Sequence, residues 1–400
     1  MQGAGTITVI LGGLPVLAAW LLELAGLSAS YRSVTDVLAE VACVLLLVLA
    51  WRFRRGRLAA ASLMLAATNW LVRGPLASNP AAVGWTVLAY LAPAGLVVLA
   101  LMPERPIRQP PVVALISVTI ATAVVIGSLL PATGSPTPPE SAASLFEILK
   151  TPEVARIAFL IAAAFAALAF AARRGAFEGS LLWVVVATAL ALLGSRNPHA
   201  ATLALTAGQV VLLLGLSEDS YRLAYQDELT GLPSRRAFEE ALPQLNGTYT
   251  LAMVDIDHFK RFNDRHGHAA GDQALRMVAS ELARISAGGK PYRYGGEEFA
   301  IVFPATTVAD ARQALDSVRQ AISDRRFAIR APDRPRRKPS KPRANKKPRS
   351  LISLTVSIGL AASGPQRFTP EAVLRSADRA LYRAKKAGRN RIIATGDRTT

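Results

Sequence analysis

The chain has little cysteine, histidine and aromatic side chain. It contains one cysteine, Cys43, and four histidines among 400 residues. One cysteine excludes an intramolecular disulfide, and the sequence holds no cysteine–histidine cluster of the kind that binds zinc. Aromatic residues make up only 6% of the chain. They are not interleaved with its basic runs, so the charge alone does not indicate a nucleic-acid partner.

Acidic residues are also scarce. There are 28 of them against 46 lysines and arginines, which gives a formal net charge of +18, yet 51% of the residues are hydrophobic. A chain can combine these two properties only if it segregates them along its length. Residues 1–216 are apolar with short polar breaks, whereas residues 217–400 are charged and have the composition of a soluble domain.

The apolar part predicts an all-α transmembrane domain, which we interpret as a sensor at residues 1–216. A spanning helix needs about 20 mostly apolar residues, and about eight segments fit this rule. The N-terminus has no basic leader, which favours a retained first span over a cleaved signal peptide. The segments lie near residues 6–27, 36–52, 57–73, 82–102, 112–131, 153–172, 180–194 and 199–216.

Short basic loops predict how these spans are oriented. The loops at 52–57, 103–109 and 173–177 are rich in arginine, and positive loops stay in the cytoplasm. Alternation then places both termini in the cytoplasm. Among the polar residues at membrane depth, Glu40 in "VLAEVACVLLL" is the candidate for a sensing pocket. No transport motif is recognisable.

The segment 217–226 connects the two parts. It has no proline or glycine, so it could continue the last span as a short, stiff helical linker. A rod of this kind passes rotation or displacement to the next domain, and a passive connector is the open alternative.

The charged half predicts an α+β fold. "TLAMVDI" is a buried-strand pattern, "PYRY" and "FAIVF" bracket the pair Gly295-Gly296, and "SLTVSIGLAAS" is a further strand. A glycine pair between two strands predicts a hairpin whose turn needs positive φ. Helical patterns alternate with these strands. We therefore expect a βαββαβ sheet of the ferredoxin-like type, with helices against one face.

Three carboxylates stand at the ends of these strands. Asp255 ends one strand, and Glu297 and Glu298 follow the hairpin. If the strands pair, Asp255 and Glu297 converge, and like charges repel unless a cation joins them. Oxygen ligands suit Mg²⁺, which binds phosphates beside one or two carboxylates. A solvated acidic turn is the alternative. The side chains that could meet a triphosphate are Lys260, Lys385 and Arg389.

Five motifs in this order resemble the GGDEF family of diguanylate cyclases, here in the GGEEF form. The resemblance covers roughly residues 222–395 and implies a nucleotidyl-cyclase fold, which we place at 227–396. The motifs are "DELTGLPSRRAF", "DIDHFKRFNDRHGHAAGD", "RYGGEEF", "TVSIGLA" and "ADRALYRAKKAGRNRI".

The resemblance implies a Mg²⁺-dependent diguanylate cyclase of the bacterial inner membrane, with its catalytic domain in the cytoplasm. The family condenses two GTP molecules into cyclic di-GMP and two pyrophosphates, and two domains face each other in a homodimer. It further implies roles for individual residues. Mg²⁺, or Mn²⁺ in its place, is expected on Asp255, the Ile256 carbonyl and Glu297. Catalysis is expected from Glu298 together with Glu297 and Asp255. Substrate is expected on Asn263, Asp272, Lys260, Lys385, Arg389, Phe259, Gly295 and Gly296.

The sequence also departs from the family pattern. Ser286 and Gly289 occupy the positions where many members carry an inhibitory Arg-x-x-Asp, so product inhibition through that site is not expected. The run 331–350 is a basic, proline-rich insertion that we expect to be disordered. It could contact anionic lipids or form a solvated loop.

Two other functions remain open from the sequence. One is a catalytically silent receptor that only binds GTP, and the other is a membrane protein in which this domain is regulatory. Retention of the acidic, basic and amide residues expected at the site argues against the silent receptor.

Overall fold

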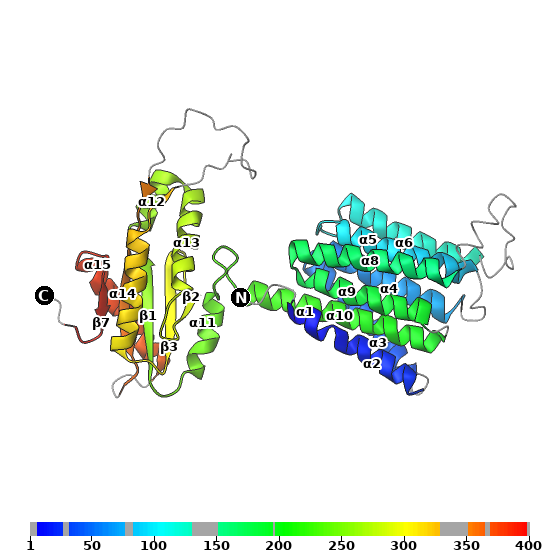
Figure 1. The fold of residues 1–400 in the computed structure, drawn as a ribbon, viewed down its shortest axis with the longest axis horizontal. Coiled ribbons are helices and arrows are strands. Elements are labelled where there is room, and N and C mark those ends of the chain that lie inside the picture. The colour runs from blue at the N-terminus through cyan, green and yellow to red at the C-terminus, as the bar shows by residue number, and fades with distance from the viewer. Residues whose placement is uncertain are drawn as a thin grey trace, which may run out of the picture. The chain divides into compact units, whose positions relative to one another are not determined.

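The computed structural model describes residues 6–26, 32–76, 83–129, 151–194, 197–328, 351–364 and 369–397. The predicted insertion at 331–350 lies outside them. The chain divides into two compact units, Met1–Tyr221 and Arg222–Thr400, which are drawn in Figure 1.

The first unit is helical. Its helices are α1 (Thr6–Leu11), α2 (Gly13–Leu24), α3 (Arg32–Arg52), α4 (Gly56–Arg73), α5 (Val83–Leu101), α6 (Pro110–Leu129), α8 (Pro152–Arg173), α9 (Ala176–Ala189) with a π-helical turn at Leu190–Gly194, and α10 (Pro198–Tyr225). In the described part of the chain, six helical stretches are long and apolar enough to cross a membrane. The predicted count of about eight is therefore not confirmed, because α4 and α6 do not meet that measure.

Helix α4 is less apolar because it lies inside the bundle. Most of its residues are buried, and it packs against α3, α5 and α6. Polar groups in such a helix can face protein instead of lipid. Arg57, for example, pairs with Glu178 of α9 at 2.7 Å and lies 4.3 Å from the ring centre of Phe177.

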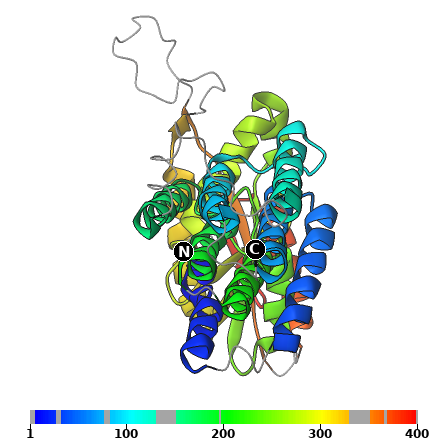
Figure 2. The same ribbon diagram turned by 90° about the vertical axis from the view of Figure 1, so that its right-hand side faces the viewer.

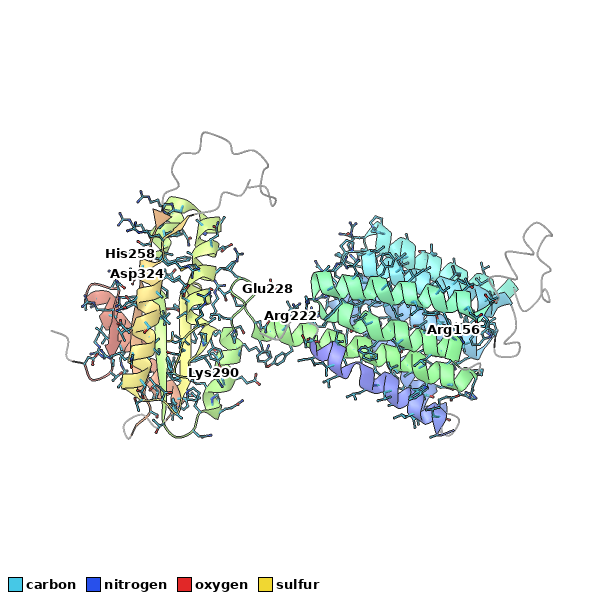
Figure 3. The ribbon with its side chains drawn as sticks, in the orientation of Figure 1. Arg156, Arg222, Glu228, His258, Lys290 and Asp324 are labelled. Atoms are coloured by element: carbon cyan, nitrogen blue, oxygen red, sulfur yellow. The ribbon has the colours of Figure 1, made fainter. Side chains whose placement is uncertain are left out.

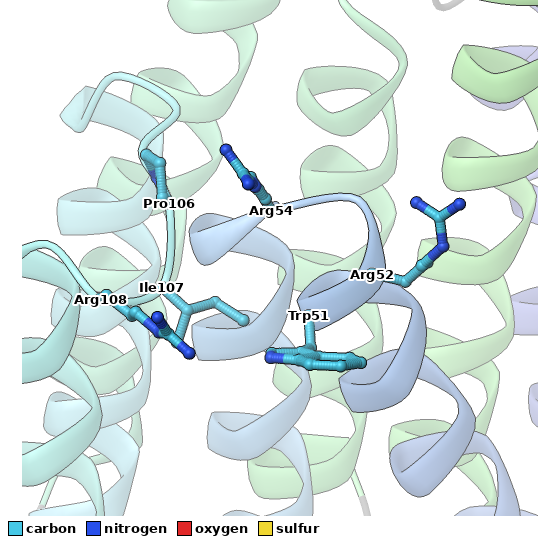
Figure 4. A pocket seen from close by; sticks show the side chains of 6 residues that line it. All are labelled: Trp51, Arg52, Arg54, Pro106, Ile107 and Arg108. Carbon is cyan, nitrogen blue, oxygen red and sulfur yellow. The ribbon is translucent and has the colours of Figure 1, made fainter.

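Two of the basic loops meet at one end of the bundle. The backbone N–H of Gly56 donates to the carbonyl of Arg105 at 2.9 Å, which ties the α3–α4 turn to the α5–α6 loop. A hollow of about 470 Å³ lies between them (Figure 4), lined by Trp51, Arg52, Arg54, Pro106, Ile107 and Arg108. Tryptophan and arginine together are typical of a membrane–water interface.

Helix α10 continues without a break to Tyr225, which covers all but the last residue of the predicted linker 217–226 and extends past Tyr221 into the second unit. Its last turn is fixed there by Ser234. The Ser234 hydroxyl donates to the carbonyl of Ala224 at 3.0 Å, and its backbone N–H donates to the carbonyl of Tyr225 at 2.8 Å.

The second unit is built on a five-stranded sheet in the order β2-β3-β1-β6-β7. The strands are β1 (Tyr249–Ile256), β2 (Lys290–Arg293), β3 (Glu298–Pro304), β6 (Val356–Ala362) and β7 (Ile392–Ala394), and β4 (Phe327–Ala328) pairs separately with β5 (Leu351–Ile352). The helices are α11 (Arg235–Ala241), η2 (Leu242–Gln244), α12 (Phe259–His266), α13 (His268–Leu282), α14 (Val308–Asp324) and α15 (Pro370–Lys386). Elements β1 to β6 of the main sheet follow the predicted βαββαβ order.

The prediction of helices against one face only is wrong. Ala252 and Val254 of β1 face a core with α12, α13 and α14, whereas Leu251 and Met253 face a second core with α11 and α15. Both faces of β1 are therefore covered, which explains why this strand is apolar at consecutive positions.

The hairpin between β2 and β3 is present, but its turn differs from the prediction. Neither Gly295 nor Gly296 has the positive φ of a primed two-residue turn. Instead the N–H groups of Tyr294 and Gly295 both donate to the carbonyl of Glu298, at 2.9 and 3.0 Å. The resulting loop is wider than a two-residue turn.

Candidate active site

Strand pairing brings the predicted carboxylates to one end of the sheet. Asp255 of β1 lies opposite Glu298 of β3 in the antiparallel ladder. One residue further on, the N–H of Ile256 donates to the carbonyl of Glu297 at 3.3 Å. Asp255 and Ile256 thus lie beside Glu297 in space, although about forty positions separate them from it in the sequence.

Asp255 is a buried charge with a cationic partner. Its side chain is 5% exposed, and its Oδ2 lies 2.7 Å from the Lys385 ammonium of α15. Burial raises the pKa of the Asp255 carboxyl above its ordinary value, and the nearby Asp257 charge adds to this, although Lys385 and Arg389 act in the opposite direction. Asp255 therefore stands where a positive charge is needed.

Glu297 completes this acidic pair. Burial raises the pKa of the Glu297 carboxyl, and the negative charges of Asp255 and Glu298 raise it further, against the effect of Lys385. In the described ranges no three histidine, cysteine or carboxylate side chains form a metal cage. Two carboxylates that leave most of the coordination sphere to water and phosphate match the way proteins hold Mg²⁺. In this structure the Lys385 ammonium supplies the positive charge beside Asp255.

We expect Glu297→Gln to stabilise the metal-free domain at neutral pH. A carboxyl whose pKa is raised by folding contributes stability that is present below its ordinary pKa and is lost as pH rises through the folded value. Glutamine removes this loss. Exchange of β1 and β3 amides, followed by mass spectrometry on the full chain without metal, should be about threefold slower in the variant at pH 7.5.

The difference should shrink as pH falls toward 4. Asp324→Asn, at the exposed end of α14 (labelled in Figure 3), is the matched control and should leave exchange in β1 and β3 unchanged. Equal exchange in wild type and Glu297→Gln at pH 7.5 would contradict the repulsion inferred here.

A second group of predicted residues lies on α12 and α13. Phe259 is buried, and the Asn263 Oδ1 is buried without a hydrogen-bond partner in the described structure. A Cβ on Gly271 would lie 2.0 Å from that oxygen, so glycine is needed there to admit Asn263. Asp272 follows on α13 and is exposed. An orphaned acceptor of this kind costs stability and is suited to a ligand that donates.

The remaining predicted residues surround the acidic pair less closely. Lys260 is exposed on α12. Arg389 follows α15 with φ of 63°, and its charge reaches Asp255. The Glu298 carboxylate folds back over the hairpin, because a Cβ on Gly295 would lie 2.8 Å from its Oε2, whereas Gly296 faces open space.

Arg293 fixes the hairpin loop. It donates to both carboxylate oxygens of Asp227, at 2.8 and 2.9 Å, and to the carbonyls of Gly295 and Gly296, at 3.2 and 2.9 Å. Burial would raise the pKa of Asp227, but bonds from Thr230 and Arg293 hold it below its ordinary value. The motif "DELTG" was the available signal, since Asp227 and Thr230 belong to it.

Asp257 supports the fold. It accepts bonds from the hydroxyls of Thr355 and Ser357, at 2.7 and 2.6 Å, and from the N–H of Asn390 at 3.1 Å. Near β2, a Cβ on Gly289 would lie 2.7 Å from the Phe303 ring. That position is therefore tightly packed.

Comparison with known proteins identifies the domain that carries this site. Residues 224–391 match the family model described as diguanylate cyclase, GGDEF domain. The chain is 36% identical over 184 residues to the response regulator PleD of Caulobacter vibrioides. The aligned residues cover 44% of this chain and 37% of PleD. It is 39% identical over 183 residues to the diguanylate cyclase DgcP of Pseudomonas aeruginosa. The aligned residues cover 44% of this chain and 24% of DgcP. The chain thus spans well under half the length of these two relatives.

Two solved structures are also similar to part of this chain. The GGDEF domain of DgcB from Caulobacter crescentus, in complex with c-di-GMP, is 35% identical, covers 44% of this chain and 97% of its own, and has a TM-score of 0.38. The active GGEEF domain of a Vibrio cholerae diguanylate cyclase is 28% identical, covers 41% of this chain and 92% of its own, and has a TM-score of 0.32.

Proposed function

We propose that this chain, whose residues 224–391 form a GGDEF domain, is a membrane-bound diguanylate cyclase. It condenses two GTP molecules into cyclic di-GMP and two pyrophosphates, as a homodimer under the control of its helical unit. The observation that carries the proposal is the pairing of the buried Asp255 with the half-buried Glu297, whose carboxyl pKa the Asp255 charge raises.

The metal is assigned to this pair. Asp255, the backbone carbonyl of Ile256 and Glu297 would hold Mg²⁺, or Mn²⁺ in its place. When bound, the ion neutralises phosphate charge and makes the α-phosphorus more electrophilic. Support comes from the two raised carboxyl pKa values and from the Lys385 ammonium at Asp255.

The guanine is assigned to Asn263 and Asp272. Guanine presents donors at N1–H and at its 2-amino group, whereas adenine has no N1–H to donate. The buried Asn263 oxygen has no partner in the described structure, so a donor there would satisfy it. A site built around unpaired acceptors rejects a base that cannot donate to them.

The triphosphate is assigned to Lys260, Lys385 and Arg389, with Phe259 buried at the start of α12. Lys385 would leave Asp255 and turn to phosphate as the ion takes its place. Gly295 and Gly296 let the hairpin backbone approach the nucleotide, and nothing lies within 4 Å of the Cβ position at Gly296. Arg293 and Asp227 hold that loop in position.

Chemistry requires two domains, each carrying one GTP. The 3′-hydroxyl oxygen of one nucleotide attacks the α-phosphorus of the other, the bond to the β-phosphate oxygen breaks, and pyrophosphate leaves. Glu298, beside Glu297, receives the hydroxyl proton. A second attack in the reverse sense closes the ring. Because Ser286 and Gly289 replace the arginine and aspartate of the Arg-x-x-Asp inhibitory site, the product would not inhibit the enzyme through that site.

The helical unit is assigned to a bacterial inner membrane, with the catalytic domain in the cytoplasm. The six apolar helical stretches among the described residues support membrane insertion, and the basic loops support this orientation. The basic run 331–350 is proposed to contact anionic lipid headgroups.

The test is product formation by the purified full chain in lipid nanodiscs with GTP and Mg²⁺. Cyclic di-GMP should appear with two pyrophosphates for each product molecule. Glu298→Gln should lower the rate about 100-fold or more while GTP still binds, because a positioned general base contributes at least that factor. A wild-type chain that binds GTP without releasing pyrophosphate would instead be the silent receptor.

A further inference from the structure

A second cavity lies within the helical unit, between α3, α4 and α10. The hollow in Figure 4 lies at the α3–α4 turn, whereas this cavity lies toward the other ends of those two helices and has a volume of about 600 Å³. Helix α3 packs on α4, whereas α2 packs on α9, and Figure 2 shows α3 standing apart from α2.

Two buried amides form the polar part of this cavity, Asn69 of α4 and Gln209 of α10. Asn69 is 6% exposed and Gln209 is 1% exposed. Neither Asn69 Oδ1 nor Gln209 Oε1 has a hydrogen-bond partner among the residues that the structure describes. Each acceptor therefore carries a desolvation cost that protein contacts leave unrelieved. The last torsion of an amide side chain is broad, so either oxygen can turn toward a donor that enters the cavity.

The charged side chains of the lining neutralise each other. Among the described lining residues they are Glu40 and Arg73, one of each sign, and their carboxylate and guanidinium lie 3.7 Å apart. Arg73 also lies 3.0 Å from the Asp36 carboxylate, so protein carboxylates already occupy its guanidinium. The lining therefore offers no net charge to compensate an ion for the water that it would lose on entry.

The rest of the described lining is largely apolar, with Val44, Ala66 and Trp70 among its residues. The cavity is open at Glu40, whose side chain is 74% exposed. A neutral molecule can thus enter there and place an apolar body against this wall.

We propose that the cavity binds a small neutral molecule with at least two hydrogen-bond donors on an apolar body, of the class of primary carboxamides and diols. Its donors would meet Asn69 Oδ1 and Gln209 Oε1. Acceptors that are otherwise unpaired select for a ligand that donates and reject an analogue that does not. Gln209 lies on α10, which continues to Tyr225, so the bound molecule would contact the helix that leads into the second unit.

Cys43 reports on what fills this cavity, because it lines the cavity and is the only cysteine in the sequence. We would measure the rate of its modification by methyl methanethiosulfonate, a small uncharged reagent, in the full chain in lipid nanodiscs. Butyramide, a neutral primary amide with two N–H donors, should slow this reaction until the site is saturated. Absence of protection would overturn the proposal. So would a thiol that does not react at all, because the cavity would then admit no small neutral molecule.

A matched pair of amides tests the donors. N,N-Dimethylbutyramide keeps the carbonyl and the chain of butyramide and has no donor. It should need a concentration about tenfold higher or more for the same protection, because a buried acceptor left unpaired costs at least that factor. The dimethyl amide is the more apolar of the two, so partitioning into the bilayer would produce the opposite order. Equal or stronger protection by the dimethyl amide would refute the site.

Butylammonium and butyrate test the charge, since both have the chain length of butyramide. At the same concentration each should protect Cys43 less than butyramide does, because Glu40 and Arg73 already neutralise each other and neither ion regains its hydration. Protection by either ion that equals or exceeds that of butyramide would contradict a neutral ligand.

Variants of the two amides locate the site. Asn69→Leu with Gln209→Leu should abolish the difference between butyramide and its dimethyl analogue. The thermal stability of this double variant should be unchanged or higher, because apolar groups replace orphaned polar ones. Gln209→Met, which keeps the length of the side chain, should reduce the difference. Gln109→Leu, at an exposed position in the α5–α6 loop, is the matched control and should preserve it.

An unchanged difference in the double variant or in Gln209→Met would show that the protection arises elsewhere, and the proposal would fail. None of these measurements uses GTP, so they stand apart from the test of the proposed function.

Discussion

Asp255→Asn should abolish cyclic di-GMP formation, with a loss of about a thousandfold or more. Asparagine keeps the shape of the side chain and removes the charge that pairs with Lys385 and that the proposed metal would need. Asp255 is 3% exposed, and its carboxyl is held at a raised pKa, so the neutral variant costs the fold little. The loss is therefore expected in catalysis and not in stability. The measurement is the rate of product formation by the full chain at saturating GTP and Mg²⁺.

Two comparisons separate this role from a structural one. Glu297→Gln should show a loss of similar size, and the double variant should lose little more than either single one, because both residues would serve one ion. Asp324→Asn is again the control and should retain wild-type activity. Additive losses in the double variant, or substantial activity in Asp255→Asn, would contradict the shared metal site.

Gly359→Ala should destabilise the catalytic unit by about 3 kcal/mol. A Cβ at this position of β6 would lie 2.1 Å from both the carbonyl oxygen of Ala377 and the backbone nitrogen of Leu381 in α15. Backbone atoms of a helix cannot rotate away, so α15 must move off the sheet. Because α15 carries Lys385, catalytic activity should fall as well.

Hydrogen exchange of β6 and α15 amides in the full chain measures this effect, and both elements should exchange faster. All five tryptophans lie before residue 184, so intrinsic tryptophan fluorescence would not report on this unit. Gly364→Ala is the matched control, since its Cβ would meet no atom within 4 Å. Wild-type exchange rates in Gly359→Ala would show that the sheet tolerates the shift.

The order of elements could be predicted from the sequence, whereas their surroundings could not. Strand and helix patterns predicted the βαββαβ order because each pattern is local. The two-sided cover of β1 was missed, although its consecutive apolar residues contained that information. Whether a helix is apolar enough to be recognised as a membrane span also depends on its surroundings. Helix α4 carries Arg57 and Asn69 because other helices enclose it, and its sequence alone does not show its neighbours.

The candidate site shows the same division. Convergence of Asp255 and Glu297 follows from which strands pair; the pattern predicted the strands, and their pairing is seen in the structure. The space that Gly271 leaves for Asn263 and the bond from Arg293 to Asp227 join residues from separate elements. They depend on how closely atoms approach, to within a few tenths of an ångström, and the spacing of residues in a sequence does not encode this.

The unbroken course of α10 sets a rule for the length of the connection. Each residue of an α-helix adds a rotation of about 100° and a rise of about 1.5 Å, so one residue inserted between Ser217 and Tyr225 rotates and advances all that follows by these amounts. Seven inserted residues return the helix nearly to its starting rotational orientation. If two catalytic domains must meet face to face, the connector can gain or lose residues only in steps that keep this angular phase.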